Sequence, residues 1–326
     1  MLGIDRIRRL AREACDRAFP GTLVLLYHRV AELPTDPFDL CVAPRAFAEH
    51  LEVMRKLARP VPLRSLALAM GRGSAPRKGV VVTFDDGYAD NLLAAAPLLE
   101  EHDVPATFFI ATGYIGSGRE FWWDELERIV RAADPGGGED GRPRRGWKYS
   151  DDDLADPGLR RYRELYPRLQ AMAPGDRDRA LRELGERVGL GPGARPDYRA
   201  MDAEELARLA SSGLFEVGAH TVHHPLLPML DGPAQLREIR ESKSWLEATI
   251  GRRVEQFSYP HGGLTAETAR LAREAGLSTA SSTRAAIVSG REDRFAIPRV
   301  VPEGLDGDGF ARFLRGWFAG GRVLTP

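Results

Sequence analysis

Cysteine is almost absent from this chain of 326 residues, since Cys15 and Cys41 are the only two. They form no CxxC pair, so the sequence suggests neither a disulfide framework nor a zinc site built on thiolates. Lysine is scarce as well, and arginine supplies nearly all of the positive charge. We attribute that preference to genomic base composition, and it indicates no function.

The chain also lacks a large charge of either sign and a long apolar run. A formal net charge of −1 gives no general attraction to nucleic acid or to an anionic membrane, so we expect no nucleic-acid partner. No run reaches the ~20 apolar residues of a membrane-spanning helix. Residues 1–19 lack the unbroken apolar core of a signal peptide. Together these absences predict a cytoplasmic protein.

The N-terminal residues 1–19 do suggest an amphipathic helix. Ile4, Ile7 and Leu10 would lie on one face, with arginines beside them. Such a helix can bind a membrane surface, so peripheral membrane association is an alternative location. We favour a helix that packs against the rest of the protein, and nothing in the sequence indicates an oligomeric state.

Short apolar segments alternate with helical patterns along the chain. They span residues 23–28, 80–84, 106–110, 215–220, 254–259, 277–282 and 295–300. This alternation predicts parallel strands joined by right-handed helical crossovers. We therefore predict the α/β class and an irregular (β/α)7 barrel, formed by a single domain over residues 1–326.

The alternation is interrupted between the third and fourth strand-like segments. This interval, about residues 116–200, contains Trp122 and Trp123 and then two helical patterns, at 157–172 and 176–188. We predict a mainly helical insertion that covers one face of the barrel.

Polar residues stand where several of the strand-like segments end. In parallel α/β barrels the active site forms at that edge. The residues that satisfy this condition are His28, Asp85, Asp86, His220, Tyr259 and Arg299. Because they come from separate strands yet share one edge, we expect them to meet in a single site.

Two of these segments carry the residues of a metal site. His220 and His224 are four residues apart and can present both rings on one side of a turn. With one carboxylate from Asp85 or Asp86 they would hold a divalent ion and leave a position open for water. The other carboxylate could then move protons. The alternative is that the histidines are ordinary loop residues and that the acidic pair belongs to a turn.

At these residues the chain resembles the polysaccharide deacetylases of the NodB-homology type, carbohydrate esterase family 4. The first family motif, Thr-Phe-Asp-Asp-Gly, is intact at 83–87, and the second, His-Ser/Thr-x-x-His-Pro, is intact at 220–225. The resemblance spans roughly residues 23–301 apart from the insertion. It implies an irregular barrel enzyme that removes acetyl groups from N-acetylated sugars.

The resemblance also implies roles for individual residues. Asp85 would be the general base, and Asp86, His220 and His224 would hold the metal. Zn²⁺ is the first expectation for this ligand set, and Co²⁺, Ni²⁺ or Fe²⁺ would also fit.

The later motifs depart from the better-known members of the family. The third usually reads Arg-x-Pro-aromatic-Gly, but residues 258–262 lack the Arg, and the last strand-like segment lacks the usual His. Instead His28 follows the first segment, an order similar to that of the biofilm poly-N-acetylglucosamine deacetylases, which implies that His28 is the general acid. We predict that Arg299 replaces the missing Arg and keeps Asp85 ionised. An ordinary salt bridge elsewhere is the alternative for Arg299.

The resemblance further suggests residues that contact the substrate. They are Tyr259, Pro260, His261 and Gly262, which would shape the oxyanion site, and Trp122 and Trp123, which could stack on a sugar ring. The backbone N–H of His261 would face the oxyanion. The alternative for the two tryptophans is that they anchor the insertion to the core.

We predict a metal-dependent N-deacetylase of an N-acetylated amino sugar, acting in surface-glycan or sugar-intermediate metabolism. One alternative is an amide hydrolase of the same barrel that cleaves a C–N bond in a small non-sugar molecule. Another is a glycan-binding module without activity, which the complete set of motif residues disfavours. The identity of the sugar cannot be derived from the sequence. The apparent lack of a signal peptide favours a cytoplasmic intermediate or a lipid-linked precursor over mature polymer.

Overall fold

The computed structural model describes residues 21–133, 144–145, 157–191, 193–302 and 304–319. The helix predicted within residues 1–19 lies outside this part of the chain. None of the helices in the described ranges is long and apolar enough to cross a membrane.

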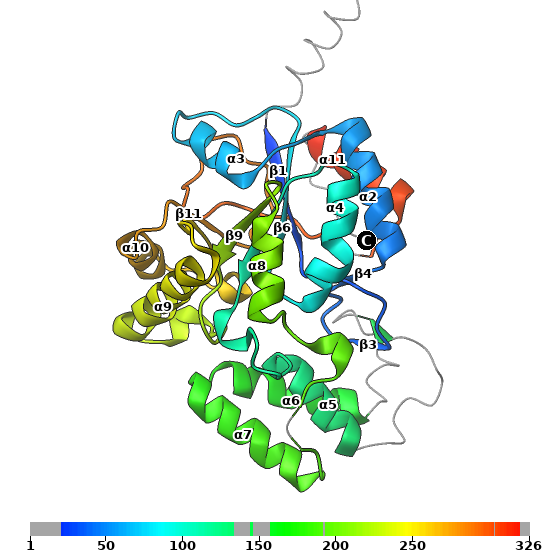
Figure 1. The fold of residues 1–326 in the computed structure, drawn as a ribbon, viewed down its shortest axis with the longest axis vertical. Coiled ribbons are helices and arrows are strands. Elements are labelled where there is room, and N and C mark those ends of the chain that lie inside the picture. The colour runs from blue at the N-terminus through cyan, green and yellow to red at the C-terminus, as the bar shows by residue number, and fades with distance from the viewer. Residues whose placement is uncertain (1–20, 134–143, 146–156, 192, 303, 320–326) are drawn as a thin grey trace, which may run out of the picture.

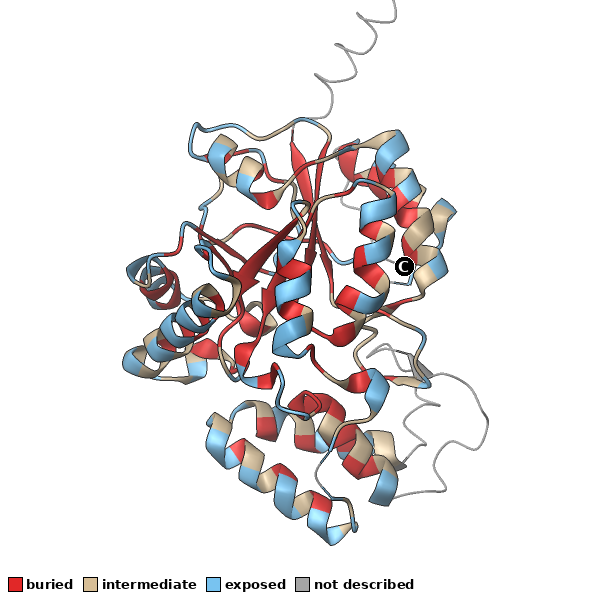
Figure 2. Ribbon diagram, in the orientation of Figure 1, coloured by how far each residue is buried: buried red, intermediate tan, exposed pale blue. Residues whose placement is uncertain are grey.

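A parallel sheet forms the centre of the molecule (Figure 1). Its strands follow the order β1-β6-β7-β9-β10-β11, and β5 pairs with β6 at the side of this path. Their bounds are β1 Thr22–Tyr27, β5 Arg59–Pro60, β6 Gly79–Phe84, β7 Ala106–Ile110, β9 Phe215–Ala219, β10 Gln256–Ser258 and β11 Thr279–Ser281. Strands β1, β6 and β7 are buried throughout, as Figure 2 shows in red, which explains why they read as apolar runs rather than as alternating patterns.

The seventh predicted strand, at residues 295–300, makes two isolated parallel bridges instead of a continuous strand. Ile297 bridges Ser281 on β11, and Val300 bridges Leu25 on β1. The segment thus links the two edges of the sheet. Its ladder is short because Pro298 has no N–H to donate. The prediction of an irregular α/β barrel is confirmed in this form.

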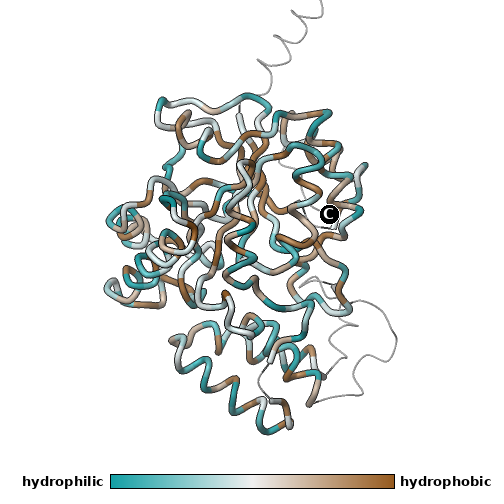
Figure 3. The backbone as a smooth tube through the Cα atoms, viewed as in Figure 1, coloured by the Kyte–Doolittle hydropathy of each residue, from teal (hydrophilic) through white to brown (hydrophobic). Residues whose placement is uncertain are grey.

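Helices pack around the sheet with their apolar faces inward. They are α2 Pro44–Leu57, α3 Leu63–Met70, α4 Ala96–Glu101, α8 Ala203–Ser211, α9 Gly232–Ile250, α10 Ala266–Glu274 and α11 Gly307–Phe318. Figure 3 shows hydrophobic residues along the central strands and hydrophilic ones on the outside. The ends follow local signals: Asp202 caps α8 in a capping box, and Gly251 ends α9 with φ 67°.

Three further helices lie together at one end of the sheet (Figure 1). They are α5 Trp122–Ala133, α6 Pro157–Gln170 and α7 Pro174–Arg187, and they come between β7 and β9. A mainly helical insertion between the third and fourth predicted strands is therefore confirmed. The exact limits of the domain and of the insertion stay a prediction.

Short elements complete the described chain. They are β2 Arg29–Val30, β3 Thr35–Asp36, β4 Cys41–Val42, β8 Arg144–Arg145, η1 Asn91–Ala95, η2 Thr112–Tyr114, η4 Pro196–Tyr198, η5 Leu227–Met229 and η6 Pro260–Gly262. Strand β2 pairs with β4, and β3 pairs with β8. The η6 turn matters for the site, because it carries the residues of the third motif.

Candidate metal centre and active site

Three buried side chains form a cluster that could hold a metal ion. Asp86 follows β6, while His220 and His224 follow β9, and one ligand atom of each lies within 4.8 Å of the others. The Nε2 atoms of His220 and His224 are 3.5 and 3.3 Å from Oδ1 of Asp86. Strands β6 and β9 flank β7 and run parallel to it, so their carboxyl ends lie at the same edge of the sheet.

The loops that carry the cluster adopt rare backbone conformations. Asp86, Thr221 and His224 have φ angles of 77°, 65° and 51°. A non-glycine residue in this region is unfavourable, and such residues gather where the surrounding structure enforces a functional geometry. The turn at Asp86 also separates the side chains of the two adjacent aspartates, so that one faces the histidines and the other faces Arg299.

The chemistry of the cluster fits a divalent cation. Oδ1 of Asp86 is buried and has no hydrogen-bond partner among the described residues, while it faces both imidazoles. Burial acts to raise the pKa of Asp86, but the contacts with His220 and His224 hold that pKa well below its usual range. Burial lowers the pKa of His224 to about 4. An anionic carboxylate and a neutral imidazole are the forms that bind a metal.

His220 is fixed differently from its neighbour in the cluster. Its Nδ1 lies 2.8 Å from the backbone oxygen of Ser258 on β10. Burial acts to lower the pKa of His220, but Asp85 and Asp86 raise it overall. Because a metal binds the neutral imidazole, metal binding at His220 should weaken in acid.

Asp85 is held by a buried bidentate ion pair. Nη1 and Nη2 of Arg299 donate to Oδ1 and Oδ2 of Asp85, each at 2.7 Å. The Ser258 hydroxyl donates to Oδ2 at 3.0 Å and accepts from Arg299 at 2.7 Å. Although burial acts to raise the pKa of Asp85, Arg299 and then His220 keep it below its usual range. The structure thus brings Arg299 to the carboxylate that the sequence paired it with.

Ser258 is a residue that the sequence reasoning did not assign. It stands where the third family motif usually has its Arg, and its hydroxyl joins Asp85 to Arg299. The missing Arg of the motif was therefore the signal in the sequence that could have pointed to Ser258. The guanidinium comes instead from Arg299, and the small side chain at position 258 leaves room for it.

A pocket of about 220 Å³ opens over these groups. It is lined by Leu26, His28, Phe38, Leu40, Asp85, Asp86, Trp123, Tyr166, His220, His224, His261, Gly262, Thr283 and Val301. His28 and the metal cluster thus share one cavity with Asp85. Its remaining lining is mostly apolar or aromatic, as expected for a small-molecule site with a few convergent polar groups.

The predicted substrate-binding residues divide into two groups. His261, Gly262 and Trp123 line the pocket. Tyr259 and Trp122 are 0% exposed, and the Tyr259 hydroxyl donates to the Phe295 carbonyl at 2.9 Å. Pro260 is buried behind the same turn. The structure thus gives Trp122 no exposed face, and sugar stacking remains a prediction that its geometry does not favour.

The insertion contributes two residues that no motif signalled. Tyr166 on α6 lines the pocket, and its ring stacks on Trp122 with centroids 4.7 Å apart. Arg177 on α7 is 1% exposed and donates to the backbone oxygen of His223 at 2.6 Å. Both occur in ordinary amphipathic helical patterns, so the sequence alone could not have identified them.

The three cluster ligands lie within the part of the chain that matches a known protein family. The model of the family described as polysaccharide deacetylase matches residues 72–133 and 193–280. These stretches contain both aspartates and the three cluster ligands but neither α6 nor α7. No curated protein sequence matches this chain at a significant level.

Several solved structures share the fold. The Streptococcus pyogenes deacetylase PplD is 16% identical, with a TM-score of 0.59 over 91% of this chain and 99% of that chain. IcaB from Ammonifex degensii is 19% identical, with a TM-score of 0.60 over 92% and 97%. A de-N-acetylase from Aggregatibacter actinomycetemcomitans is 14% identical, with a TM-score of 0.58 over 90% and 99%. At such low identities these structures establish the barrel and not the substrate.

Proposed function

We propose that this chain, whose residues 72–133 and 193–280 match the polysaccharide deacetylase family model, is a metal-dependent hydrolase that removes acetyl from an N-acetylated amino sugar. The observation that carries the proposal is a three-ligand cluster beside a second, separately held carboxylate in one pocket. This combination supplies both of the groups that amide hydrolysis by water requires.

We assign Asp86, His220 and His224 as the ligands of the cation. Two imidazoles and one carboxylate suit Zn²⁺ first, and Co²⁺, Ni²⁺ or Fe²⁺ would fit the same donors. When bound, the cation would polarise the amide carbonyl and lower the pKa of water.

Asp85 is the proposed general base. Of the roughly four lone-pair positions of a carboxylate, Arg299 and Ser258 use one on Oδ1 and two on Oδ2. The position left on Oδ1 of Asp85 can take the proton from the attacking water. Arg299 keeps the carboxylate ionised and fixes its plane, which makes Arg299 a positioning residue for the base.

His28 is the proposed general acid. Its ring lines the pocket together with Asp85, and it would protonate the nitrogen that leaves as the amine. Positioned acids of this kind contribute typically ~10²–10⁴-fold to a rate. The backbone N–H of His261, in a turn shaped by Tyr259 and Pro260, would donate to the developing oxyanion.

The pocket supports a substrate of limited size. At about 220 Å³ it is smaller than the roughly 300–1,000 Å³ of sites for drug-sized ligands, so we propose that it takes one N-acetylated sugar unit. That unit could be free, nucleotide-linked, lipid-linked or the end of a polymer. The cytoplasmic location and the membrane-surface contact of residues 1–19 stay predictions.

An acetate-release assay tests the proposal. Protein stripped of metal and reloaded with Zn²⁺ would be incubated with free, nucleotide-linked, lipid-linked and polymeric N-acetylhexosamines. We expect acetate from at least one of them, and none from Asp85→Asn, which retains all three metal ligands. Tight Zn²⁺ binding without acetate from any of these sugars would contradict the proposed activity. Cleavage of a non-sugar amide instead would favour the alternative hydrolase.

A further inference from the structure

The second metal histidine lacks the support that the first one has. Nδ1 of His220 is bonded to a backbone oxygen, whereas Nδ1 of His224 is buried without a hydrogen-bond partner among the described residues. Metal-binding histidines almost always use the second ring nitrogen to fix their orientation. The ring of His224 must therefore be oriented by other contacts.

Aromatic rings surround His224 in place of that hydrogen bond. The Trp123 ring lies 4.7 Å from it, centroid to centroid, at an interplanar angle of 62°. The His261 ring lies at 4.5 Å and 77° on another side. Edge-to-face contacts of this kind are favourable and directional. Trp123 comes from α5 and is 4% exposed, so it forms a fixed wall against the imidazole.

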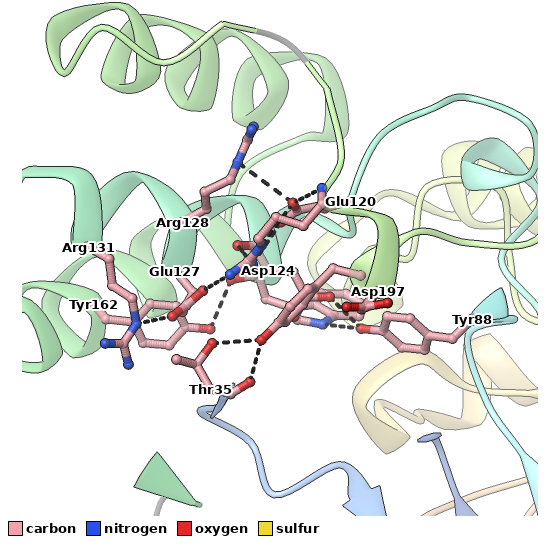
Figure 4. Close-up of polar contacts among 12 residues, drawn as sticks. Thr35, Tyr88, Glu120, Asp124, Glu127, Arg128, Arg131, Tyr162 and Asp197 are labelled. Atoms are coloured by element: carbon pink, nitrogen blue, oxygen red, sulfur yellow. Dashed lines mark hydrogen bonds and ion pairs between the residues drawn. The ribbon is translucent and has the colours of Figure 1, made fainter. Parts of the chain in front are cut away.

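Trp123 is in turn held by a chain of hydrogen bonds. Its Nε1–H donates to the Tyr88 hydroxyl at 2.8 Å, and that hydroxyl donates to Oδ2 of Asp124 at 2.7 Å. Figure 4 shows Tyr88 and Asp124 facing each other within this cluster. The indole can only donate and the hydroxyl has one hydrogen, so the direction of both bonds is fixed. Tyr88 is 0% exposed and lies two residues after Asp86.

Partly buried ion pairs to Glu120 and Glu127 keep α5 in place next to these hydrogen bonds (Figure 4). Arg195 donates to Glu120 at 2.9 Å, to Glu127 at 2.7 Å and to the backbone oxygen of Asp124 at 3.0 Å. Glu120 and Glu127 are almost completely buried. The helix that carries Trp123 is therefore anchored independently of the metal cluster.

From these contacts we propose that Trp123, held by Tyr88 and Asp124, is a positioning residue that orients the ring of His224 for metal binding. The proposal rests on the function proposed above, because it concerns the same cation. It gives Trp123 a role that does not depend on contact with the sugar, and it gives Asp124 a role that the sequence did not suggest.

The dissociation constant for Zn²⁺, measured by competition with a chromophoric chelator, tests this proposal without an activity assay. We expect Tyr88→Phe and Trp123→Phe each to weaken binding by about 10- to 100-fold, the usual effect of removing support from a metal ligand. The double variant should bind like Trp123→Phe alone, because both changes interrupt the same chain.

Tyr198→Phe is the matched control. It removes a buried hydroxyl from the same cluster, but that hydroxyl bonds to Thr35 rather than to Trp123. Its Zn²⁺ affinity should stay within about twofold of the parent. Asp124→Asn keeps an acceptor for Tyr88 and should also bind normally. The absorption spectrum of the Co²⁺-loaded protein should change in Tyr88→Phe and not in Tyr198→Phe.

The outcomes separate this proposal from the proposed function. Parent-like Zn²⁺ affinity in folded Tyr88→Phe and Trp123→Phe, with thermal melting confirming the fold, would overturn the role of Trp123 and leave the deacetylase assignment standing. Absence of metal binding by the parent protein would overturn both. If Tyr88→Phe does not fold, Trp123→Phe together with the Co²⁺ spectrum decides the question.

Discussion

The strand ends of the barrel and the helices of the insertion present different chemistry to the same pocket. The barrel supplies the groups that can bind a metal or move a proton, such as Asp85, Asp86 and His220. The insertion supplies the rings of Trp123 and Tyr166 to the pocket, and its buried Arg177 donates to the backbone oxygen of His223 beside His224. The difference suggests that changing Asp85 or Arg299 in the barrel should act mainly on kcat or on stability. Changing the aromatic rings of the insertion should act mainly on metal or substrate affinity.

The largest effect should follow from Asp85→Asn in the barrel. The amide cannot take a proton from water, so kcat should fall by about 10³-fold or more. Zn²⁺ affinity should change little, because Asp86, His220 and His224 are untouched. Steady-state kinetics and chelator competition on the same preparation measure both quantities. A comparable loss of kcat in an insertion variant that binds metal and substrate normally would contradict the proposed difference between the barrel and the insertion.

Arg299→Ala should be the most destabilising single change at the strand ends. It leaves the carboxylate of Asp85, which is 3% exposed, buried without its cation, and removing one partner of such a pair costs about 3–5 kcal/mol. Chemical denaturation gives the free energy of unfolding. The matched control is Arg273→Ala, whose pair with Asp293 is about half exposed and should contribute at most about 1 kcal/mol. Equal losses in the two variants would count against a special role for Arg299.

The two regions should also differ in the pH dependence of stability. Burial raises the pKa of Asp124 on α5 to about 7, so this group costs stability as the pH rises from about 4 to above 7. Burial lowers the pKa of His50 on α2 to about 4, so that residue costs stability as the pH falls from about 6.5 to 4. At most, the effect reaches roughly 4 to 4.5 kcal/mol for Asp124 and roughly 3.5 kcal/mol for His50.

Unfolding free energies of Asp124→Asn and His50→Gln between pH 4.5 and 8.5 measure these two effects. Relative to the parent, Asp124→Asn should gain stability towards high pH, and His50→Gln should gain it towards low pH. Differences that do not vary with pH would show that neither group titrates in this window. A reversed trend for Asp124→Asn would contradict the burial of that carboxyl group in a neutral form.

The smallest effect should come from Tyr166→Ala at the pocket wall of α6. Loss of one aromatic contact, worth about 1 kcal/mol, should raise KM by several-fold and leave kcat nearly unchanged. Tyr166→Phe retains the ring that stacks on Trp122 and serves as the control. A fall in kcat without a change in KM would place Tyr166 in the chemistry rather than in binding.

The barrel and the insertion also differ in how much of their structure could be predicted from the sequence. Strands β6 and β9 read as apolar runs followed by complete motifs, so the barrel, the cluster of Asp86, His220 and His224, and the approach of Arg299 to Asp85 could all be anticipated. The position of the seventh strand could be predicted. Its reduction to two isolated bridges could not, because its sequence reads like that of any short strand. Strand β5, at Arg59–Pro60, has too few residues to show any period.

The insertion shows why the remainder could not be predicted. Trp122 and Trp123 are adjacent, yet one is enclosed between Tyr166 and Arg177 while the other reaches His224. Which of two neighbouring rings faces the pocket depends on how α5 is rotated against the barrel. That rotation is set by long-range contacts, such as those of Arg195, that no local pattern encodes.

Anomalous diffraction from crystals of the Zn²⁺-loaded protein, collected on both sides of the zinc absorption edge, tests the central claim most directly. We predict one strong peak per chain, within bonding distance of a carboxylate oxygen of Asp86 and of Nε2 of His220 and His224, with Asp85 beside it and unligated. A peak at another place, or none in fully loaded crystals, would contradict the metal centre and the chemistry derived from it.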